Sequence, residues 1–401
     1  MNKDSLFNKD FLLDTGINFV VYLIYYLLMV IIAVVAKQQL NASLSEAGLA
    51  SGIFILGTLL ARLQVGKGIE LYGRKKTLYI GVFFYLVTTL MYFYIPNLGI
   101  MYVIRFLNGM AYGLLSTATN TIITSCIPEQ RRGEGINYYG LSTSLAAAIG
   151  PFLGMLLMLV ANFTVIIITC TVLIGLCVIG CLMLHVTEIK LTDAEIKRMK
   201  AFNLENYVEV RVLVISVIGF LMGFAYSSVL SFLAAYTREI NLVQAGTFFF
   251  VVYAVIITIT RPLTGIIFDR KGENYVLYPC YICLALGLFM LSITNTAVML
   301  LLAGVFVGLG YGTFMSNGQA VCIKLTPSHR VSVALSTYFV ALDLGLGVGP
   351  YILGCLRTLL TFQSLYLVAA AIAGICFILY FLFYGRKASA QVSLAMENDN
   401  N

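Results

Sequence analysis

The chain has 401 residues, of which 60% are hydrophobic and only 11% are charged. A water-soluble domain of this size carries far more charge on its surface, so the composition excludes an ordinary soluble protein. The net charge of +7 raises the question of a nucleic-acid partner, but the lysines and arginines gather in the predicted loops of one side. That distribution is typical of topogenic charge in a membrane protein, so we expect no nucleic-acid partner.

The apolar residues form long, continuous runs, which are typical of helices in lipid. Their continuity favours a bundle of helices over a β-barrel, whose strands alternate apolar and polar residues. The first run follows a short charged leader that ends at Asp14, and it is too long and too aromatic for a signal peptide. The bias of Lys and Arg predicts that both termini are cytoplasmic. The fold class is therefore an all-α membrane protein, with twelve transmembrane helices predicted near residues 15–36, 46–68, 77–94, 98–126, 136–160, 163–185, 209–235, 245–268, 276–294, 297–325, 332–356 and 364–384.

Cysteine and histidine usage gives no sign of metal or redox chemistry. Cys280 and Cys283 form a C-x-x-C, but the pair lies in the ninth apolar run without a second ligand pair, so apolar packing is the favoured interpretation. His185 and His329, the two histidines of the chain, lie at predicted helix ends. The spans and their flanks also lack paired carboxylates and a nucleophile motif, so we expect no metal, no cofactor and no enzymatic activity.

The sequence contains an internal repeat with an offset of 199 residues, the difference between positions 62 and 261. The stretch "RLQVGKGIELYG" at 62–73 recurs as "RPLTGIIFDRKG" at 261–272, and "GMAYG" at 109–113 recurs as "GLGYG" at 308–312. Two tandem halves with an even number of spans are parallel repeats, related by an axis along the membrane normal. The predicted organisation is a six-helix bundle over 1–186, a cytoplasmic linker over 187–208, a second six-helix bundle over 209–385 and a cytoplasmic tail over 386–401.

Three stretches resemble signatures of the major facilitator superfamily, and within it the twelve-helix drug and metabolite proton antiporters. The stretch "GKGIELYGRKK" at 66–76 resembles the family's G-x-x-x-D-x-x-G-R-K loop, with Glu70 in place of the aspartate. The stretch "RFLNG" at 105–109 resembles the helix 4 signature, with Asn108 in place of glutamine, and "AAAIGPFLG" at 146–154 resembles the helix 5 antiporter signature. The resemblance covers about residues 12–385 and implies two six-helix halves that rock about a central site.

The resemblance also implies that the loop residues form a cytoplasmic gate. The acid and the bases that follow it would tie the two halves together, partly by capping the helix that begins the eleventh span, as the helix dipole favours. Topogenic charge with a weak surface ion pair, turn glycines and snorkelling arginines are the alternatives at these positions. The gate candidates are Arg62, Gly66, Glu70, Gly73, Arg74, Lys75, Arg261, Gly265, Asp269, Arg270 and Gly272.

Three polar residues inside the spans are candidates for transport or proton coupling. Arg105 lies below the outer end of helix 4, and its repeat counterpart is glycine, so we expect it to face water, a partner or a substrate. The resemblance implies proton coupling for Arg105, and anion recognition is the alternative. Asp343 is predicted to be the one acid deep in a span, and both proton exchange and a structural hydrogen bond are open interpretations. Asn108 belongs to the helix 4 signature.

Other residues are expected to bend helices or to line the path. Gly and Pro residues of helices 5 and 11 would act as hinges: Gly150, Pro151, Gly154, Gly349 and Pro350. Helices 1, 4, 7 and 10 line the path in the family, which makes cavity candidates of Tyr22, Tyr25, Tyr26, Asn120, Tyr226, Asn317 and Gln319. Each of these is equally consistent with packing. With few ionisable groups in the spans, an apolar and aromatic cavity favours amphipathic substrates.

These features predict a monomeric, proton-coupled, alternating-access exporter of a small amphipathic molecule or metabolite in a bacterial plasma membrane. Its partners would be that small molecule, protons and the lipid bilayer. A nutrient importer or uniporter of the same fold is the first alternative. The second is a non-transporting membrane sensor, which predicts a sizeable soluble module that the sequence lacks.

Overall fold

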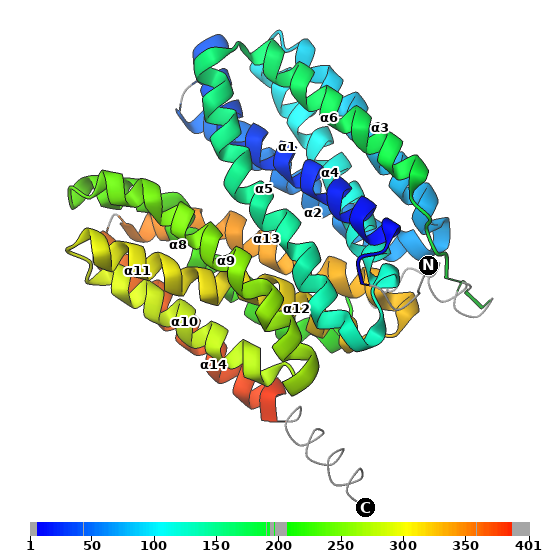
Figure 1. The fold of residues 1–401 in the computed structure, drawn as a ribbon. Helices are drawn as coiled ribbons and strands as arrows, with labels where there is room; N and C mark the ends of the chain where they lie inside the picture. Colours follow the sequence, from blue (N-terminus) through cyan, green and yellow to red (C-terminus); the bar gives the residue numbers. More distant parts are fainter. Residues whose placement is uncertain are drawn as a thin grey trace, which may run out of the picture. The chain divides into compact units, whose positions relative to one another are not determined.

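The computed structural model describes residues 6–42, 44–189, 191–192, 196, 207–357 and 359–386. This part of the chain is helical and contains no β-strand (Figure 1). Most of the predicted linker and residues 387–401 of the predicted tail lie outside the described residues. The side chains of Pro151 and Pro350 also lie outside them.

The first sequence repeat forms six long helices. Asparagine side chains begin three of them: Asn8 accepts from the Phe11 N–H, Asn97 from the Ile100 N–H and Asn162 from the Val165 N–H. The single-turn helices η1 (Met91–Phe93) and η2 (Glu129–Arg131) flank the connections. The long helices are α1 (Lys9–Gln39), α2 (Leu44–Tyr72), α3 (Arg74–Leu90), α4 (Leu98–Cys126), α5 (Arg132–Val160) and α6 (Phe163–Met183).

The second repeat forms the matching set of helices. A π-helical turn, η5 (Gly308–Gly312), joins α11 and α12 into one continuous rod at the repeated glycine-rich stretch. Shorter turns are η4 (Val210–Val212), η6 (Ser328–Arg330) and η7 (Phe381–Gly385). The longer helices are α8 (Leu213–Glu239), α9 (Val243–Lys271), α10 (Asn274–Ser292), α11 (Ala297–Val307), α12 (Thr313–Lys324), α13 (Val331–Arg357) and α14 (Phe362–Tyr380).

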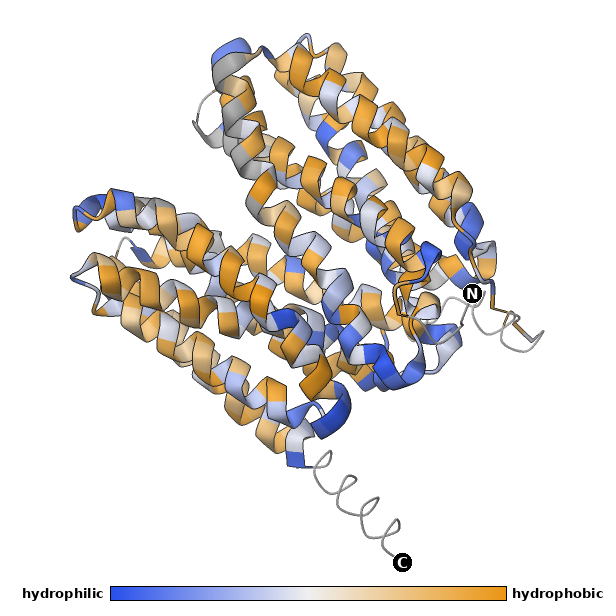
Figure 2. Ribbon diagram, in the orientation of Figure 1, coloured by the Kyte–Doolittle hydropathy of each residue, from blue (hydrophilic) through white to orange (hydrophobic). Residues whose placement is uncertain are grey.

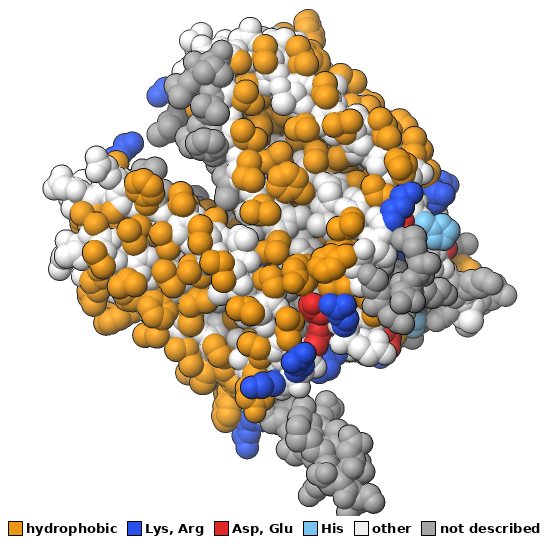
Figure 3. All heavy atoms as spheres, in the orientation of Figure 1, with side chains coloured by type: hydrophobic (Ala, Val, Ile, Leu, Met, Phe, Trp, Pro, Cys, Tyr) orange, Lys and Arg blue, Asp and Glu red, His pale blue; other side chains and the backbone are white. Residues whose placement is uncertain are grey.

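Among the described residues, ten helical segments are long and apolar enough to cross a membrane. The hydrophobic residues extend along the helices, and hydrophilic residues gather at helix ends (Figure 2). In α6, for example, Val172, Leu176 and Ile179 are more than half exposed, whereas Ile166 and Cys170 on the other face are buried. Hydrophobic side chains cover the helices on the face seen in Figure 3. Such surfaces are stable in lipid but not in water, which makes this a multi-pass membrane protein.

The remaining two long helices of the described part, α2 and α5, do not meet that criterion, and the longest apolar helical stretch of α2 is Gly52–Gly66. The crossing of all twelve predicted segments and the cytoplasmic position of the termini therefore remain predictions. The helix α1 begins at Lys9, six residues before the apolar run predicted near residue 15. The reason is the Asn8 cap together with packing of the helix start, which places Asp14 inside α1 with none of its surface exposed.

The chain divides into two compact units that do not coincide with the two sequence repeats. Unit 1 contains 1–129 and 139–210, but it also takes 326–340 from the second repeat. Unit 2 contains 211–325 and 341–401, and it takes 130–138 from the first repeat. Each unit therefore includes the first turns of one helix, α13 or α5, from the opposite repeat.

Candidate functional site

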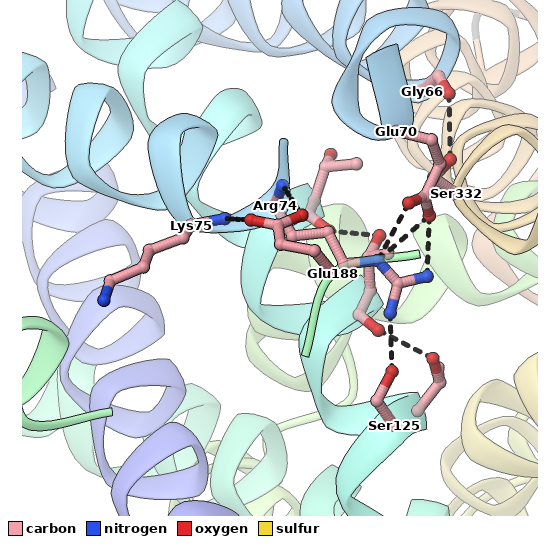
Figure 4. Close-up of polar contacts among 10 residues, drawn as sticks. Gly66, Glu70, Arg74, Lys75, Ser125, Glu188 and Ser332 are labelled. Carbon is pink, nitrogen blue, oxygen red and sulfur yellow. Dashed lines mark hydrogen bonds and ion pairs between the residues drawn. The ribbon is translucent and has the colours of Figure 1, made fainter. Parts of the chain in front are cut away.

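Two of the gate candidates, Arg62 and Gly66, take part in a first contact, which joins α2 to the beginning of α13 within unit 1. Ser332 donates a hydrogen bond to the Gly66 carbonyl at 3.1 Å (Figure 4), and Ser336 donates to the Arg62 carbonyl. A Cβ atom placed on Gly66 would lie 2.4 Å from the Cβ atom of Ser336. Glycine at position 66 therefore permits an approach of the two helices that any larger residue would prevent. The Arg62 guanidinium also lies 4.9 Å from the centre of the Phe339 ring.

A buried ion pair lies beside this contact. The Arg74 Nε donates to both carboxylate oxygens of Glu70, at 3.1 and 3.0 Å, and Nη2 donates to Oε1 at 2.7 Å (Figure 4). Arg74 also donates to the hydroxyl of Ser125. Glu70 is 6% exposed and Arg74 is 1% exposed. Burial raises the pKa of Glu70 above its usual value, although Arg74 acts in the opposite direction.

Glu188, in the connector after α6, also binds to this region, beside the Glu70–Arg74 ion pair. It was not identified from the sequence. Its carboxylate accepts hydrogen bonds from the backbone N–H groups of Arg74 at 2.8 Å and Lys75 at 2.9 Å (Figure 4). An anion is favoured at this place because the first N–H groups of α3 have no partner within the helix. Gly73, which precedes α3, has a φ of +94°, a conformation that glycine adopts easily. No local signal links an acid to a helix that begins more than a hundred residues earlier.

Two further gate candidates, Gly265 and Asp269, take part in a second contact, which joins α9 to the beginning of α5 within unit 2. The Asp269 carboxylate accepts from the N–H groups of Gly133 at 2.7 Å and Glu134 at 2.8 Å. A Cβ atom on Gly265 would lie 2.8 Å from the Gly133 carbonyl oxygen and 3.1 Å from the Asn137 Cβ atom. Positions 133 and 137 are the repeat counterparts of 332 and 336 at the same offset of 199. The two contacts are therefore built from matching residues of the two repeats.

The two copies differ in which acid caps a helix. The resemblance implied a cap on the helix of the eleventh span, α13, but Glu70 is held by Arg74. The cap that the structure shows is the one that Asp269 provides at the beginning of α5. Arg261 is buried and donates to the Gly312 carbonyl at 3.2 and 2.9 Å. Arg270 is exposed, and Gly272, like Gly73, has a positive φ, of +91°.

Arg105 is bound by protein groups and has no exposed surface. Its Nε donates to the Ala50 carbonyl at 2.9 Å, its Nη1 contacts the Tyr92 hydroxyl at 3.4 Å, and its guanidinium lies 4.5 Å from the centre of the Phe54 ring. Of the three environments expected for Arg105, this conformation shows a partner within the protein, since the α2 backbone and aromatic rings surround it. Asn108 is also fully buried and donates to Thr88 at 3.0 Å.

Each unit contains an aromatic cluster, and two of the three positions in each cluster are related by the sequence repeat. In unit 1 the Tyr25 ring stacks on Tyr112, with ring centres 4.8 Å apart, and on Phe54 at 5.2 Å. In unit 2 the Tyr226 ring stacks on Tyr311 at 4.1 Å and on Tyr253 at 5.6 Å. Phe54 and Tyr253 are repeat counterparts, as are Tyr112 and Tyr311. Sequence reasoning found Tyr25 and Tyr226 but missed their four partners, although the repeated "AYG" and "GYG" offered a signal.

The other cavity candidates are mainly packed inside one unit. Tyr22, Asn120, Asn317 and Gln319 are buried, and Tyr26 is half-buried. Asn317 exchanges hydrogen bonds with Asn137 of α5, at 3.1 and 3.3 Å, and so holds the beginning of α5 beside α12.

The glycines expected at hinges are close-packing points in the structure. A Cβ atom on Gly150 or on Gly154 would lie 2.9 or 3.0 Å from a backbone oxygen of α1. One on Gly349 would lie 2.1 Å from the Ser227 hydroxyl of α8. Asp343, on the same helix as Gly349, is half-buried in unit 2.

A helical membrane protein whose two sequence repeats contribute matching contacts belongs, as a class, with the secondary transporters. The family model described as "Major Facilitator Superfamily" matches residues 15–350 and 275–399. The chain therefore belongs to the major facilitator superfamily, as its sequence signatures predicted.

Known proteins agree with this assignment. An MFS-type transporter of Methanocaldococcus jannaschii, named as uncharacterised, is 22% identical over 84% of this chain and 89% of its own length. The multidrug resistance protein MdtG of Salmonella typhi is 26% identical over 41% of this chain and 42% of its own length. The crystal structure of FucP in the outward conformation aligns with a TM-score of 0.73 at 16% identity, over 94% of this chain and 98% of that one. The human organic anion transporter MFSD10 aligns with a TM-score of 0.70 at 13% identity, over 92% and 98%.

Proposed function

We propose that the protein is an alternating-access carrier that exports a small amphipathic compound in exchange for protons across a bacterial plasma membrane. The observation that carries this proposal is the pair of repeat-related contacts, α2 with α13 and α9 with α5. Each joins helices of different sequence repeats through one glycine, and each has polar bonds that water can replace when the helices separate. Contacts of this kind are suited to repeated opening and closing.

The aromatic clusters support a planar, amphipathic substrate. Tyrosine rings bind flat apolar groups by stacking, and their faces attract cations. Tyr25 and Tyr253 are half-buried, so each cluster has aromatic surface that is not enclosed by its own unit. The partial match to a multidrug resistance protein supports export over import. In the proposed cycle Arg105 and Asp343 contribute to proton coupling, the loop residues act as cytoplasmic gates and the helix 5 and 11 glycines permit bending.

Transport into everted membrane vesicles tests this function and its direction. We choose ethidium as the probe because it is a planar aromatic cation. Everted vesicles that contain the protein should accumulate ethidium when their lumen is acidic, and a K⁺/H⁺-exchanging ionophore should abolish the accumulation. Vesicles without the protein are the control. Gradient-dependent accumulation in right-side-out vesicles alone would show an importer and would contradict the proposal.

A further inference from the structure

Asp14 is a buried acid that the functional account above does not use. It lies in the second turn of α1 and has no exposed surface. Neither of its carboxylate oxygens has a hydrogen-bond partner among the described residues. Its counterpart in the second repeat is Leu213, so the structural symmetry of the fold does not require an acid at this position.

One polar residue near Asp14 is engaged with side chains of two other helices. Asn18, one turn further along α1, donates to Ser142 at 2.8 Å and to Thr143 at 3.1 Å, and it accepts from Thr119 at 3.4 Å. This network ties α1 to α4 and α5. In this network the Asn18 amide nitrogen donates hydrogen bonds and the amide oxygen accepts one, whereas the carboxyl group of Asp14 takes no part.

Three titratable groups of the described residues interact with Asp14, and none of the three carries a positive charge. Three other helices provide them: Cys126 from α4, Tyr139 from α5 and Cys181 from α6. On α1 itself the ionisable group nearest in sequence is Asp10, which accepts a hydrogen bond from the His185 N–H at 3.0 Å, and Lys9 beside it is exposed.

Two ionisable groups of α2, which also packs against α1, have partners elsewhere among the described residues. Glu70 is held by Arg74, and Arg62 lies over the Phe339 ring. An ionised carboxylate without a donor or a cation is unstable in such a place by several kcal/mol. The packing seen here therefore holds Asp14 as the neutral acid.

We propose that Asp14 is a proton-binding residue of the transport cycle, neutral when α1 packs against α4, α5 and α6 and deprotonated when this packing opens to water. Release of the proton needs water or a cation at the carboxylate, and the helices exclude both in this conformation. Proton binding and the position of α1 are therefore linked, because each state of one favours a single state of the other. This inference rests on the proposed proton-coupled function but is tested without a substrate.

Infrared spectroscopy of the full-length protein in liposomes measures the protonation directly. At neutral pH the wild-type protein should show the C=O stretch of a neutral carboxylic acid, and Asp14→Asn should lack that band. Asp10→Asn is the matched control, one turn away on the same helix, and should keep it. A spectrum of Asp14→Asn that equals the wild-type spectrum would overturn the proposal.

The link to conformation is tested by a fluorescent reporter, since the chain contains no tryptophan. Phe19→Trp places a single reporter on α1, and its emission should change with pH as α1 opens. Adding Asp14→Asn should remove the change, whereas adding Asp14→Glu should keep it with a shifted midpoint. An identical midpoint with Asp14→Asn would overturn the link, whether or not ethidium is transported.

Ethidium transport then shows whether the link serves coupling. Asp14→Asn should reduce gradient-driven accumulation to the level of vesicles without the protein, while ethidium exchange without a gradient continues. Undiminished gradient-driven accumulation by Asp14→Asn would show that Asp14 has no part in proton coupling. If the wild-type protein itself does not accumulate ethidium, only the proposed export function is contradicted. The infrared and fluorescence results do not depend on ethidium transport.

Discussion

The Ser332 hydroxyl donates a hydrogen bond to the Gly66 carbonyl at 3.1 Å, across 266 residues of sequence. Their repeat counterparts, Gly133 and Gly265, also meet, since a Cβ atom on Gly265 would lie 2.8 Å from the Gly133 carbonyl oxygen. The same backbone geometry therefore occurs twice, once in each compact unit, with different side chains around it. The predictions below ask what each contact contributes to stability and transport.

Substitution at Gly66 should separate α2 from α13. In Gly66→Ala the new methyl group meets the Ser336 side chain, and overpacking of this kind costs about 1–3 kcal/mol. We expect a lower melting temperature and weaker ethidium transport. Gly52→Ala is the control on the same helix, because a Cβ atom there has open space and alanine favours a helix. Equal melting temperatures for the two variants would show that the close approach is unimportant.

Removal of the Glu70 charge should be more damaging than removal of the Asp269 charge. Glu70→Gln leaves the buried Arg74 guanidinium without its anion, and breaking a buried pair costs about 3–5 kcal/mol. Asp269→Asn keeps an oxygen that can cap α5, so a loss of less than about 1 kcal/mol is expected. Thermal unfolding and ethidium transport of the two variants measure the ranking, and the opposite order would contradict an asymmetric pair of gates.

The pair formed by Glu273 and Lys324 predicts a pH dependence of stability. Burial opposes ionisation of Glu273, but the Lys324 ammonium at 2.7 Å and the Tyr384 hydroxyl at 3.0 Å hold its pKa below the usual value. A lowered pKa in the folded state stabilises the protein above the unfolded pKa of about 4.3, and the effect is lost as the pH falls through the folded pKa.

The melting temperatures of wild type and Glu273→Gln measure this effect. Their difference should be constant between pH ~8 and ~5.5 and should shrink below pH ~4. Glu239→Gln removes the exposed pair with Arg357 and serves as the control, with little effect at any pH. A difference that grows on acidification would contradict the assigned pKa direction.

The aromatic clusters should determine affinity for planar compounds. Tyr112→Leu removes the ring that stacks on Tyr25, and we expect weaker ethidium binding by about 1 kcal/mol, or roughly fivefold. Tyr112→Phe keeps the ring and should bind as the wild type does. Fluorescence titration of the purified protein measures both affinities. If Tyr112→Leu and wild type bind equally, the unit 1 cluster has no part in substrate recognition.

Much of the fold could be predicted from the sequence, because long apolar runs are local signals. One side of each contact, Gly66 or Gly265, could also be predicted, because the two glycines repeat at a fixed offset. Ser332 and Gly133 were missed, since nothing near them in sequence marks a partner 266 or 132 residues away. Arg105 was placed on the correct helix, but its bond to the Ala50 carbonyl depends on how α2 packs against α4.

Asp14 is a further residue whose environment could not be predicted from the sequence. Its charged neighbours in sequence, Lys9 and Asp10, made it look like part of a polar leader. Only the packing of α4, α5 and α6 around α1 shows that its carboxyl group is enclosed. Burial of a single polar residue near a helix start is set by tertiary structure, which the hydropathy of the run does not encode.

Reversible locking of the α9–α5 contact tests the central claim most directly, that this contact opens during transport. In Asn137→Cys/Gly265→Cys the two Cβ atoms start 3.1 Å apart, near the separation of about 3.8 Å in a disulfide. The α5 backbone at Gly133 and Glu134 must also shift to admit the new side chain, so the reduced double variant is the reference for transport. The three native cysteines that are not buried, Cys126, Cys283 and Cys355, would be replaced by serine. The account predicts that oxidation stops gradient-driven ethidium accumulation in everted vesicles and that a reductant restores it. Full accumulation by the cross-linked protein would contradict the account.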